Sequence, residues 1–530
     1  MDENGHTILP PGTVPLVEFE VATDDTRLIL SPAPSNDPNE PLNWAPWRKY
    51  FNFLLIMAMT IAAFTSLQIQ TVFWQQMSVD LNLRTSQLNN AQSGNLAGLA
   101  VGCIFFIPFT VKYGRRLVYI LSICVLAAAT WWTARIQSFA ELMCTSVICG
   151  LAGAINETAV QMTIADMFFV HQRATANACY FASVMIGSFL APIAGGAQAA
   201  TQGWRWSYYA LAIALTCVSF IFIFCYEETK YVPISNGQRE GGPIQTSMDG
   251  EAPEKEKLPE GADLTIVAST AMAEPAPPLN TYRQRMRLIT KTDESLWKLF
   301  VMPLSVITLP HVLFTALQFA SAIAWLVLFM PAVSVIFSAP PYSFTTAGVG
   351  YMTLGPFVGN ALGSLYGGPL SDWSAKWFAK RNGGLYEPEM RLYILPLPIA
   401  CMASGLIMFG VTADKGMHWI LPSVGGALFA FGMGAMGDIT FTFTVDTYRE
   451  LIAEAFVGVA FFRNAFSVAI PFSLVPWMTT MGVSNMFIII GCLSLAIGLL
   501  FIPMIIWGKR IRTALTPRYY HLVDKHAHVS

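Results

Sequence analysis

Apolar stretches of about 20 residues recur along the whole chain and are separated by short polar loops. A helix of roughly that length crosses about 30 Å of hydrocarbon, so each stretch is long enough to span a membrane. The twelve stretches lie near 51–72, 89–110, 117–135, 141–164, 177–199, 205–226, 305–330, 346–367, 391–411, 418–441, 455–477 and 484–507. The sequence therefore predicts an all-α membrane protein with twelve transmembrane helices.

Composition supports lipid rather than water as the solvent for most of the chain. Of the 530 residues, 54% are hydrophobic and 12% are charged, which is about half the charged share of a typical soluble domain. The basic residues are scattered among short loops, so no nucleic-acid partner is expected. The nine cysteines lie inside apolar stretches without a CxxC pair, and the sequence has no GxxxxGK[ST], GxSxG or HExxH motif. We therefore predict a protein that is not an enzyme and has no metal site and no cofactor.

Basic residues alternate from one loop to the next. The loops 338–344 and 479–483 contain no Lys or Arg. By the positive-inside rule, the loops that do contain them face the cytoplasm, and so do both termini. These loops follow the second, eighth and twelfth stretches and include Lys112, Arg115, Arg116, Lys376, Lys380, Arg381, Arg391, Lys509, Arg510 and Arg512. We expect a multi-pass protein of the plasma membrane, with the vacuolar membrane as the alternative.

A polar segment separates the sixth and seventh apolar stretches. It contains NGQREGGP, APEKEKLPEG and AEPAPPLN, which are too rich in Pro, Gly and Glu to pack. We expect a disordered cytoplasmic linker at 227–298, between a first six-helix half at 49–226 and a second at 299–508. Cytoplasmic tails are expected at 1–48 and 509–530.

An internal repeat relates the two halves. A shift of 261 residues places Val111 on Asp372, so the acid that is missing beside the first basic loop is present in the second half. A shift of 280 residues places Asp166 on Asp446. The repeat predicts two pseudo-symmetric halves, and its glycines are expected to allow close helix contact rather than to bind a ligand. The glycines and prolines matched by the shift of 261 are Gly94, Gly98, Gly102 and Pro108, which fall on Gly355, Gly359, Gly363 and Pro369.

The loops VKYGRR and GGPLSDW, one in each half, resemble the GxxxDRxGRR motif of the major facilitator superfamily. The stretches DPNEPLNW, IADMFFVHQRA, RNGGLYEPEMRL and VDTYRELIAEAFVGVAFFRN are similar to fungal members of its drug and polyamine proton antiporter branch. The resemblance covers about 48–508 and implies a transporter that exchanges protons for its substrate.

The chain departs from the family pattern at three positions. The acid of the loop motif is Val111, and the helix-four arginine of antiporters falls on Ser146. The helix-five antiporter signature GxxxGPxxGG has Ala191 in place of its central glycine. The resemblance still implies a signature at Gly187, Pro192, Gly195 and Gly196.

Two acids lie deep within apolar stretches, where an ionisable side chain is costly. Glu157 follows Asn156, with Gln161 one turn further along the same helix face. A carboxylate there can exchange a proton or neutralise a cationic substrate. Asp438 lies at nearly the same depth in the second half, so the two acids are predicted to face a central cavity. The alternatives are a structural hydrogen bond for Glu157 and a helix cap for Asp438.

Charged residues near the cytoplasmic helix ends are expected to form a gate. Asp166 and Asp446 would pair with Arg115 or Arg116 in one state of the transport cycle and lose the pair in another. Arg463, nine residues into the eleventh stretch, would pair with one of these acids. The alternative is a set of exposed pairs that contribute about 0 to 1 kcal/mol. The complete expected gate comprises Lys112, Arg115, Arg116, Asp166, Asp372, Asp446 and Arg463.

Five further polar or aromatic residues within the apolar stretches are weaker candidates for the lining of a cavity. They would offer hydrogen bonds and cation-π faces to an amphipathic or ammonium-bearing ligand, although residues of this kind more often serve packing. These residues are Gln68, Gln318, Trp325, Tyr180 and Asn360.

The sequence favours a monomeric, proton-coupled secondary transporter, with a small-molecule substrate, protons and the lipid bilayer as its partners. Export of a drug, a toxin-like metabolite or a polyamine is the leading hypothesis. One alternative is a proton-coupled importer of polyamines or related amines. The other is a transporter-like solute sensor that signals through the linker and the C-terminal tail.

Overall fold

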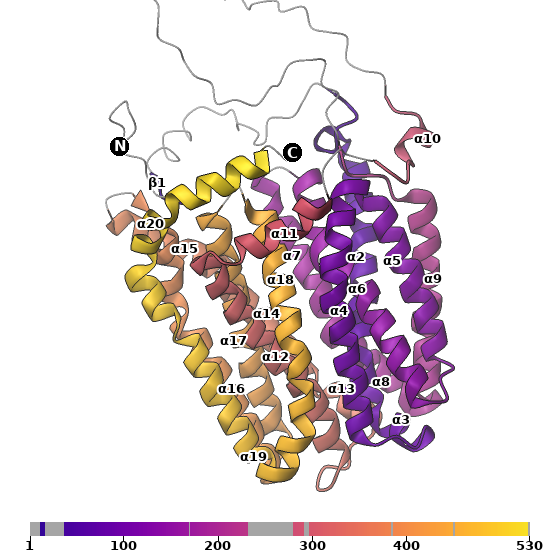
Figure 1. The fold of residues 1–530 in the computed structure, drawn as a ribbon. Coiled ribbons are helices and arrows are strands. Elements are labelled where there is room, and N and C mark those ends of the chain that lie inside the picture. The colour runs from indigo at the N-terminus through magenta and orange to yellow at the C-terminus, as the bar shows by residue number, and fades with distance from the viewer. Residues whose placement is uncertain are drawn as a thin grey trace, which may run out of the picture.

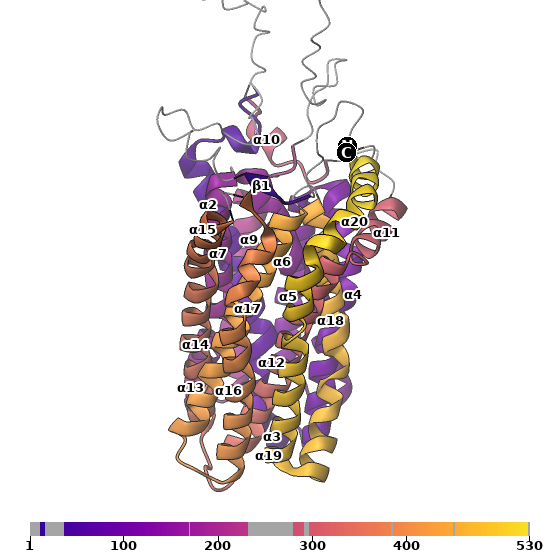
Figure 2. The ribbon, with the colours of Figure 1, turned by 90° about the vertical axis from the view of Figure 1, so that its left-hand side faces the viewer.

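The computed structural model describes residues 11–15, 37–168, 170–231, 279–290, 296–382, 385–448 and 451–527. Nearly all of them are helical, and the long helices stand side by side in one bundle (Figure 1). A view from the side shows that the bundle is elongated along its helix axes (Figure 2). The remaining parts of the predicted linker and tails lie outside the described residues.

Each half of the chain contributes one group of helices. The first half comprises α2 Pro46–Gln68, η2 Ile69–Phe73, α3 Trp74–Asp80, α4 Thr85–Tyr113, α5 Arg115–Thr133, α6 Phe139–Met167, α7 Val170–Met185, the π-helical η3 Ile186–Leu190, α8 Ala191–Gln202 and α9 Trp204–Cys225. The second half comprises α11 Leu296–Val306, α12 Pro310–Ser338, α13 Thr346–Tyr351, α14 Leu354–Leu365, the π-helical η4 Tyr366–Leu370, α15 Ser371–Arg381, η5 Pro388–Ile394, α16 Pro396–Asp414, α17 Ile420–Thr447, α18 Ile452–Ala469, α19 Pro471–Gly498 and α20 Phe501–Ala527. The short elements outside these groups are β1 Val14–Pro15, η1 Pro41–Asn43, α10 Tyr282–Arg285 and β2 Leu385–Tyr386.

The helices agree with twelve membrane passes. Ten helical stretches among the described residues are long and apolar enough to cross a membrane. One of them, Glu454–Val523, is 70 residues long and leaves helical geometry at Gly482, so it supplies two passes. Another pass is divided into the consecutive elements α13, α14, η4 and α15. It is therefore not one of the ten long helical stretches. The chain is an all-α membrane protein with two six-helix halves.

The internal repeat appears as two equivalent helix crossings. In the first half α4 packs on α6, and a Cβ atom on Gly98 would overlap the carbonyl oxygen of Val147. In the second half α14 packs on α17, and a Cβ atom on Gly359 would overlap the carbonyl oxygen of Ala427. Val147 and Ala427 are related by the same shift of 280 residues that relates Asp166 to Asp446. The matched glycines therefore serve close helix packing.

Gly482 makes the turn between the eleventh and twelfth passes. Its φ of 76° and ψ of 164° lie in a region of backbone geometry that is essentially restricted to glycine, although an added Cβ atom would meet nothing within 4 Å. We expect Gly482→Ala to lower the free energy of unfolding by about 1–3 kcal/mol through backbone strain alone. Thermal unfolding in detergent measures the effect. Gly368→Ala is the matched control, because Gly368 also has free space but no positive φ; equal stability of the two variants would contradict the strain.

One end of the bundle carries the described parts of both tails, and we call it the tail face (Figure 1). The predicted disorder of the linker is wrong at both of its ends. Residues 227–231 and 279–290 are folded onto this face, with Glu228 N donating to Arg285 O at 3.4 Å and Thr290 N to Tyr113 O at 2.9 Å. Polar composition alone did not reveal these contacts, because the partners are backbone groups at helix ends.

Candidate transport site

An ion pair joins the two halves deep within the bundle. Glu157 lies on α6, whose start is fixed by Ser138 as N-cap with Glu141 N donating to its hydroxyl. Arg463 lies on α18, and its Nη2 pairs with Glu157 Oε2. The Glu157 side chain is 8% exposed and the Arg463 side chain is 10% exposed. Among the ion pairs between described residues, this pair connects the two halves and the others do not.

Two further side chains complete the polar contacts of the pair. Asn464 Nδ2 donates to Glu157 Oε2 at 2.8 Å, and Arg463 Nε donates to Asn464 Oδ1 at 3.0 Å. Cys103 on α4 is 1% exposed, and its sulfur lies 3.4 Å from Asn464 Nδ2. One carboxylate oxygen of Glu157 therefore accepts from two residues of the opposite half.

Aromatic rings surround the arginine side of the pair. The guanidinium of Arg463 lies over the Phe319 ring, 5.2 Å from its centroid. Phe319 contacts Phe441 at a centroid distance of 4.6 Å, and Phe441 in turn contacts Phe456 at 5.1 Å and Phe181 at 6.4 Å. Because Phe181 belongs to the first half and the other rings to the second, this cluster also spans the boundary. The faces of aromatic rings like these favour binding of a cation or an amphipathic molecule.

Several buried polar atoms of the bundle have no hydrogen-bond partner among the described residues. Both amide atoms of Asn156 are in this state, as are Trp325 Nε1 and Asn360 Oδ1. A buried polar atom without a partner is costly, so such atoms call for water or a ligand as the partner. Tyr180 differs, because its hydroxyl donates to Asn156 O at 3.0 Å.

The other predicted site residues have contacts of their own, none of them with the Glu157–Arg463 pair among the described hydrogen bonds and ion pairs. Asp438 is on α17 with Ser364 within hydrogen-bonding reach and Gly367 packed on its Cβ atom, so its described contacts are within the second half. Gln318 Nε2 donates to Ile497 O at 2.9 Å on α19. Gln68 ends α2 and Gln161 lies one turn beyond Glu157 on α6, and both are half-buried.

The charged pairs expected to form the gate lie inside single halves. Arg115 Nε is 2.9 Å from Asp166 Oδ2, and both residues belong to the first half. In the second half Arg391 bridges two acids, with Nη1 2.6 Å from Asp372 Oδ1 and Nε 2.6 Å from Asp446 Oδ2. These pairs therefore tie helix ends together within a half.

Two members of the expected gate have other partners. Arg116 donates to backbone carbonyls, including Tyr226 O and Ile223 O at 2.7 Å each, instead of pairing with Asp166 or Asp446. Arg463, expected at these acids, instead pairs with Glu157. The reason is depth: Arg463 lies about three turns from the start of α18, too far from the helix ends for such a pair.

Glu228 and Lys230 bind the basic loop, a role that the sequence pattern did not indicate. Glu228 accepts hydrogen bonds from the backbone N–H groups of Arg115 at 2.9 Å and Arg116 at 3.2 Å, which open α5. Lys230 Nζ donates to Lys112 O at 3.1 Å, at the end of α4. Charges of these signs complement the two helix ends. The available signal was the charged YEETK sequence directly after the sixth apolar stretch.

The glycine-rich stretch of the fifth pass lies in close contact with α2 and with the second half. The π-helical η3 begins at Ile186, and a Cβ atom on Gly187 would lie 2.6 Å from Ile61 O. Gly195 packs on Ile69, and a Cβ atom on Gly196 would lie 2.9 Å from Thr346 O in the other half. Pro192 is the second residue of α8, which directly follows this π-helical turn. The stretch thus allows close contact between the halves there.

Two helical halves that meet at a buried ion pair, with aromatic rings beside it, indicate a membrane transport protein. Residues 54–471 match the family model of the Major Facilitator Superfamily, and the chain belongs to this superfamily. Among the described residues, no group of three His, Cys, Asp or Glu side chains is placed to hold a metal ion.

The chain is also similar to individual fungal proteins over nearly its full length. It is 29% identical to an uncharacterized MFS-type transporter, C1271.10c, of Schizosaccharomyces pombe, with 99% of this chain and 96% of that protein covered. It is 25% identical to protein HOL1 of Saccharomyces cerevisiae, with 95% and 93% covered. It is 25% identical to the MFS antiporter QDR3 of Candida albicans, with 91% and 81% covered. The chain is therefore a transporter with a small-molecule substrate and not an enzyme.

Proposed function

We propose that this transporter couples proton movement to the export of a small organic compound, such as a drug, a toxin-like metabolite or a polyamine, across the plasma membrane. The tail face is the cytoplasmic face in this proposal, as the loop charges indicate. The observation that carries the proposal is the Glu157–Arg463 pair between the halves. The similarity to QDR3, which is named as an antiporter, supports exchange as the mode of transport.

The pair provides a physical reason for coupling. Alternating access requires an element whose contacts differ between two states. Protonation of Glu157 would remove its negative charge, weaken its attraction for Arg463 and so favour separation of α6 from α18. A cationic substrate would have the same effect, because it can replace Arg463 as the partner of the carboxylate. Proton and substrate thereby compete for one site, which is the requirement of an antiporter.

The remaining site residues take supporting roles. The Phe319–Phe441 cluster would contact apolar parts of the substrate, and the unpartnered amide of Asn156 would bind its polar groups. Arg115–Asp166 and the Arg391 bridge would keep each half rigid while the halves move relative to one another. We expect the protein to act as a monomer, because all residues of the proposed site belong to one chain.

Metabolite profiling of cells and medium tests the function and identifies the substrate in the same experiment. We expect one compound to accumulate inside cells that lack the gene and outside cells that overexpress it, with a dependence on external pH. A nutrient left in the medium only by the deletion strain would show uptake instead. If no compound changes with gene dosage, or if the change ignores external pH, proton-coupled export is contradicted.

A further inference from the structure

Residues 279–290, which we call the linker segment, are held at the tail-face end of the first half. Tyr282 in α10 donates its hydroxyl to Phe224 O at 2.6 Å, near the end of α9. Thr290 N donates to Tyr113 O at 2.9 Å, at the end of α4. Figure 1 shows α10 beyond the end of α9, at the edge of the bundle. The linker segment therefore lies at the level where the spanning helices end.

The linker segment is basic and also partly apolar. It contains three arginines and no Asp or Glu. Arg283 and Arg287 are exposed, and neither has a hydrogen bond or an ion pair with another described residue. Unpaired cations next to exposed apolar side chains are typical of a segment that lies at a membrane surface. The exposed large apolar side chains of the segment are Leu279, Tyr282, Leu288 and Ile289.

The acids that lie against the linker segment have other partners. Glu228 N donates to Arg285 O at 3.4 Å, but its carboxylate accepts from the backbone N–H groups that open α5. Glu227 forms an ion pair with Arg48. Neither acid therefore neutralises the exposed arginines of the segment.

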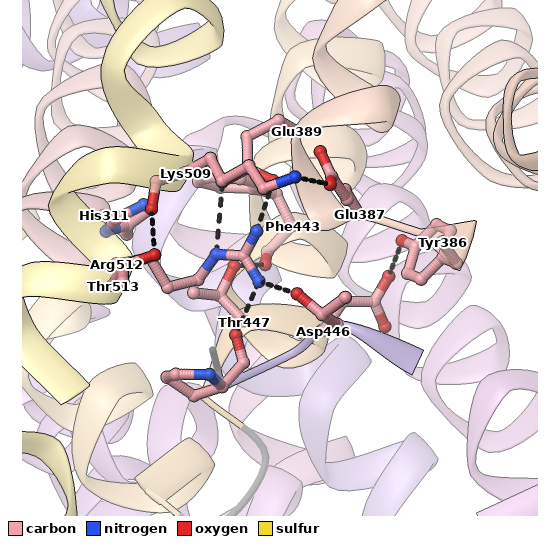
Figure 3. A network of polar contacts seen from close by, with 12 residues as sticks. His311, Tyr386, Glu387, Glu389, Phe443, Asp446, Thr447, Lys509, Arg512 and Thr513 are labelled. Atoms are coloured by element: carbon pink, nitrogen blue, oxygen red, sulfur yellow. Dashed lines mark hydrogen bonds and ion pairs between the residues drawn. The ribbon is translucent and has the colours of Figure 1, made fainter. Parts of the chain in front are cut away.

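Three cations of the second half provide a contrast, because each is paired with an acid. Arg512 Nη2 is 2.9 Å from Glu389 Oε2, and Figure 3 shows Lys509 paired with Glu387 beside them. Arg391 bridges two acids of its own half. These cations are neutralised within the protein, in contrast to the exposed arginines of the linker segment.

Residues 11–15 also cover this region of the second half. β1 pairs with β2 in antiparallel register, and the fully buried Arg512 donates from Nη1 to Pro11 O at 2.7 Å. Gly12 has a φ of +85°, and a Cβ atom there would lie 2.6 Å from Asp446 O. Arg512 is therefore occupied by the protein's own chain, whereas the exposed arginines of the linker segment are open to an external ligand.

A groove between α5 and α9 begins next to the point where the linker segment is attached. Its lining includes Ile223, the residue before Phe224, whose carbonyl accepts from Tyr282. Small and apolar side chains, Ala128 and Phe220 among them, make up most of the lining, and the volume is about 290 Å³. The groove therefore has room for part of an acyl chain, directly beside a basic segment.

The groove faces lipid in the leaflet next to the tail face. α9 is the least buried of the ten long helical stretches, and Leu121, Phe220 and Phe224 beside the groove are exposed. On α9 the lining begins at Thr216, nine residues before the helix ends at Cys225, so the groove lies within about 14 Å of that end. Half of the hydrocarbon core of a bilayer is about 15 Å thick, so the groove belongs to one leaflet.

We propose that the linker segment and this groove together bind an anionic phospholipid of the leaflet at the tail face. An acyl chain lies in the groove, and Arg283 and Arg287 bind the phosphate and the acidic headgroup at the membrane surface. A guanidinium group suits this role, because it donates two parallel hydrogen bonds to a phosphate. The inference is independent of the transported compound and of proton coupling.

Native mass spectrometry of the purified full-length protein tests the headgroup contacts. After removal of copurified lipid, the wild type should retain added phosphatidylserine several-fold more than phosphatidylcholine with the same acyl chains. Arg283→Gln combined with Arg287→Gln should abolish this preference. Lys509→Gln combined with Arg510→Gln is the matched control, because it removes two exposed cations from the same face and should keep the preference. Equal retention of both lipids by the wild type, or equal preference in the two double variants, would overturn the site.

A second variant tests the groove. Ala128→Phe places a large side chain in the groove and should lower retention of phosphatidylserine several-fold. Ala400→Phe is the control, because Ala400 is also exposed on a spanning helix but does not line the groove. Soluble glycerophosphoserine, which has the headgroup without acyl chains, should not displace the lipid at equal concentration. Displacement by glycerophosphoserine would show a site for a soluble anion, and wild-type retention in Ala128→Phe would exclude the groove; either result contradicts the proposal.

Discussion

Replacement of Arg463 by methionine should lower the free energy of unfolding by about 3–5 kcal/mol, because it leaves the Glu157 carboxylate buried without its counter-ion. Both side chains of the pair are about nine-tenths buried, so solvent screens the remaining charge poorly. Methionine keeps an apolar side chain over the Phe319 ring, where it can make a favourable sulfur–aromatic contact. The predicted loss of stability therefore comes from the unpaired charge of Glu157 and not from a cavity at position 463.

Two further variants isolate this charge effect. Lys509→Met removes the cation of the Glu387 pair, in which the lysine is 60% exposed, and should cost no more than about 1 kcal/mol. Glu157→Gln combined with Arg463→Met removes both charges and keeps an acceptor for Asn464, so it should recover most of the lost stability. Unfolding of the three purified variants in a common detergent provides the measurement. A double variant as unstable as Arg463→Met alone would show that the pair is not the source of the loss.

The sequence predicted the membrane passes and the glycine crossings because both depend on local pattern. Each pass needs a run of apolar residues, and Gly98 and Gly359 recur at a fixed shift because the two halves repeat one helix crossing. Glu157 could be singled out for a related reason, since an acid in an apolar run is costly and requires a partner.

The partner itself was not predictable from local pattern, because Arg463 lies 306 positions further along the chain. The depth of each residue along its helix could have indicated the pairing. Glu157 lies about three turns before the end of α6 and Arg463 about three turns after the start of α18. Both of those helix ends lie at the tail face, so the two residues reach the same level. The contacts of residues 11–15 had even less signal, because they rest on backbone pairing and on one glycine with positive φ.

Glutamine at position 157 should remove the dependence of transport on the pH gradient. Glutamine has nearly the shape of glutamate and can still accept the hydrogen bond from Asn464, but it cannot bind and release a proton. In vesicles loaded with the exported compound, wild-type flux should respond to an imposed pH gradient, whereas flux through Glu157→Gln should be the same with and without the gradient. The measurement must be made per molecule of folded protein in the membrane, because the variant leaves Arg463 without a counter-ion.

The double variant, Glu157→Gln with Arg463→Met, separates loss of coupling from loss of folding, since it lacks the carboxylate but contains no unpaired buried charge. It should be as insensitive to pH as Glu157→Gln. Asp438→Asn is the matched control: Asp438 is an acid at similar depth whose described contacts are Ser364 and Gly367 within its own half. Since Asp438 does not bridge the halves, its variant should keep most of the response to the gradient. A pH response that survives in Glu157→Gln and is lost in Asp438→Asn would move proton coupling from the boundary between the halves to the second half.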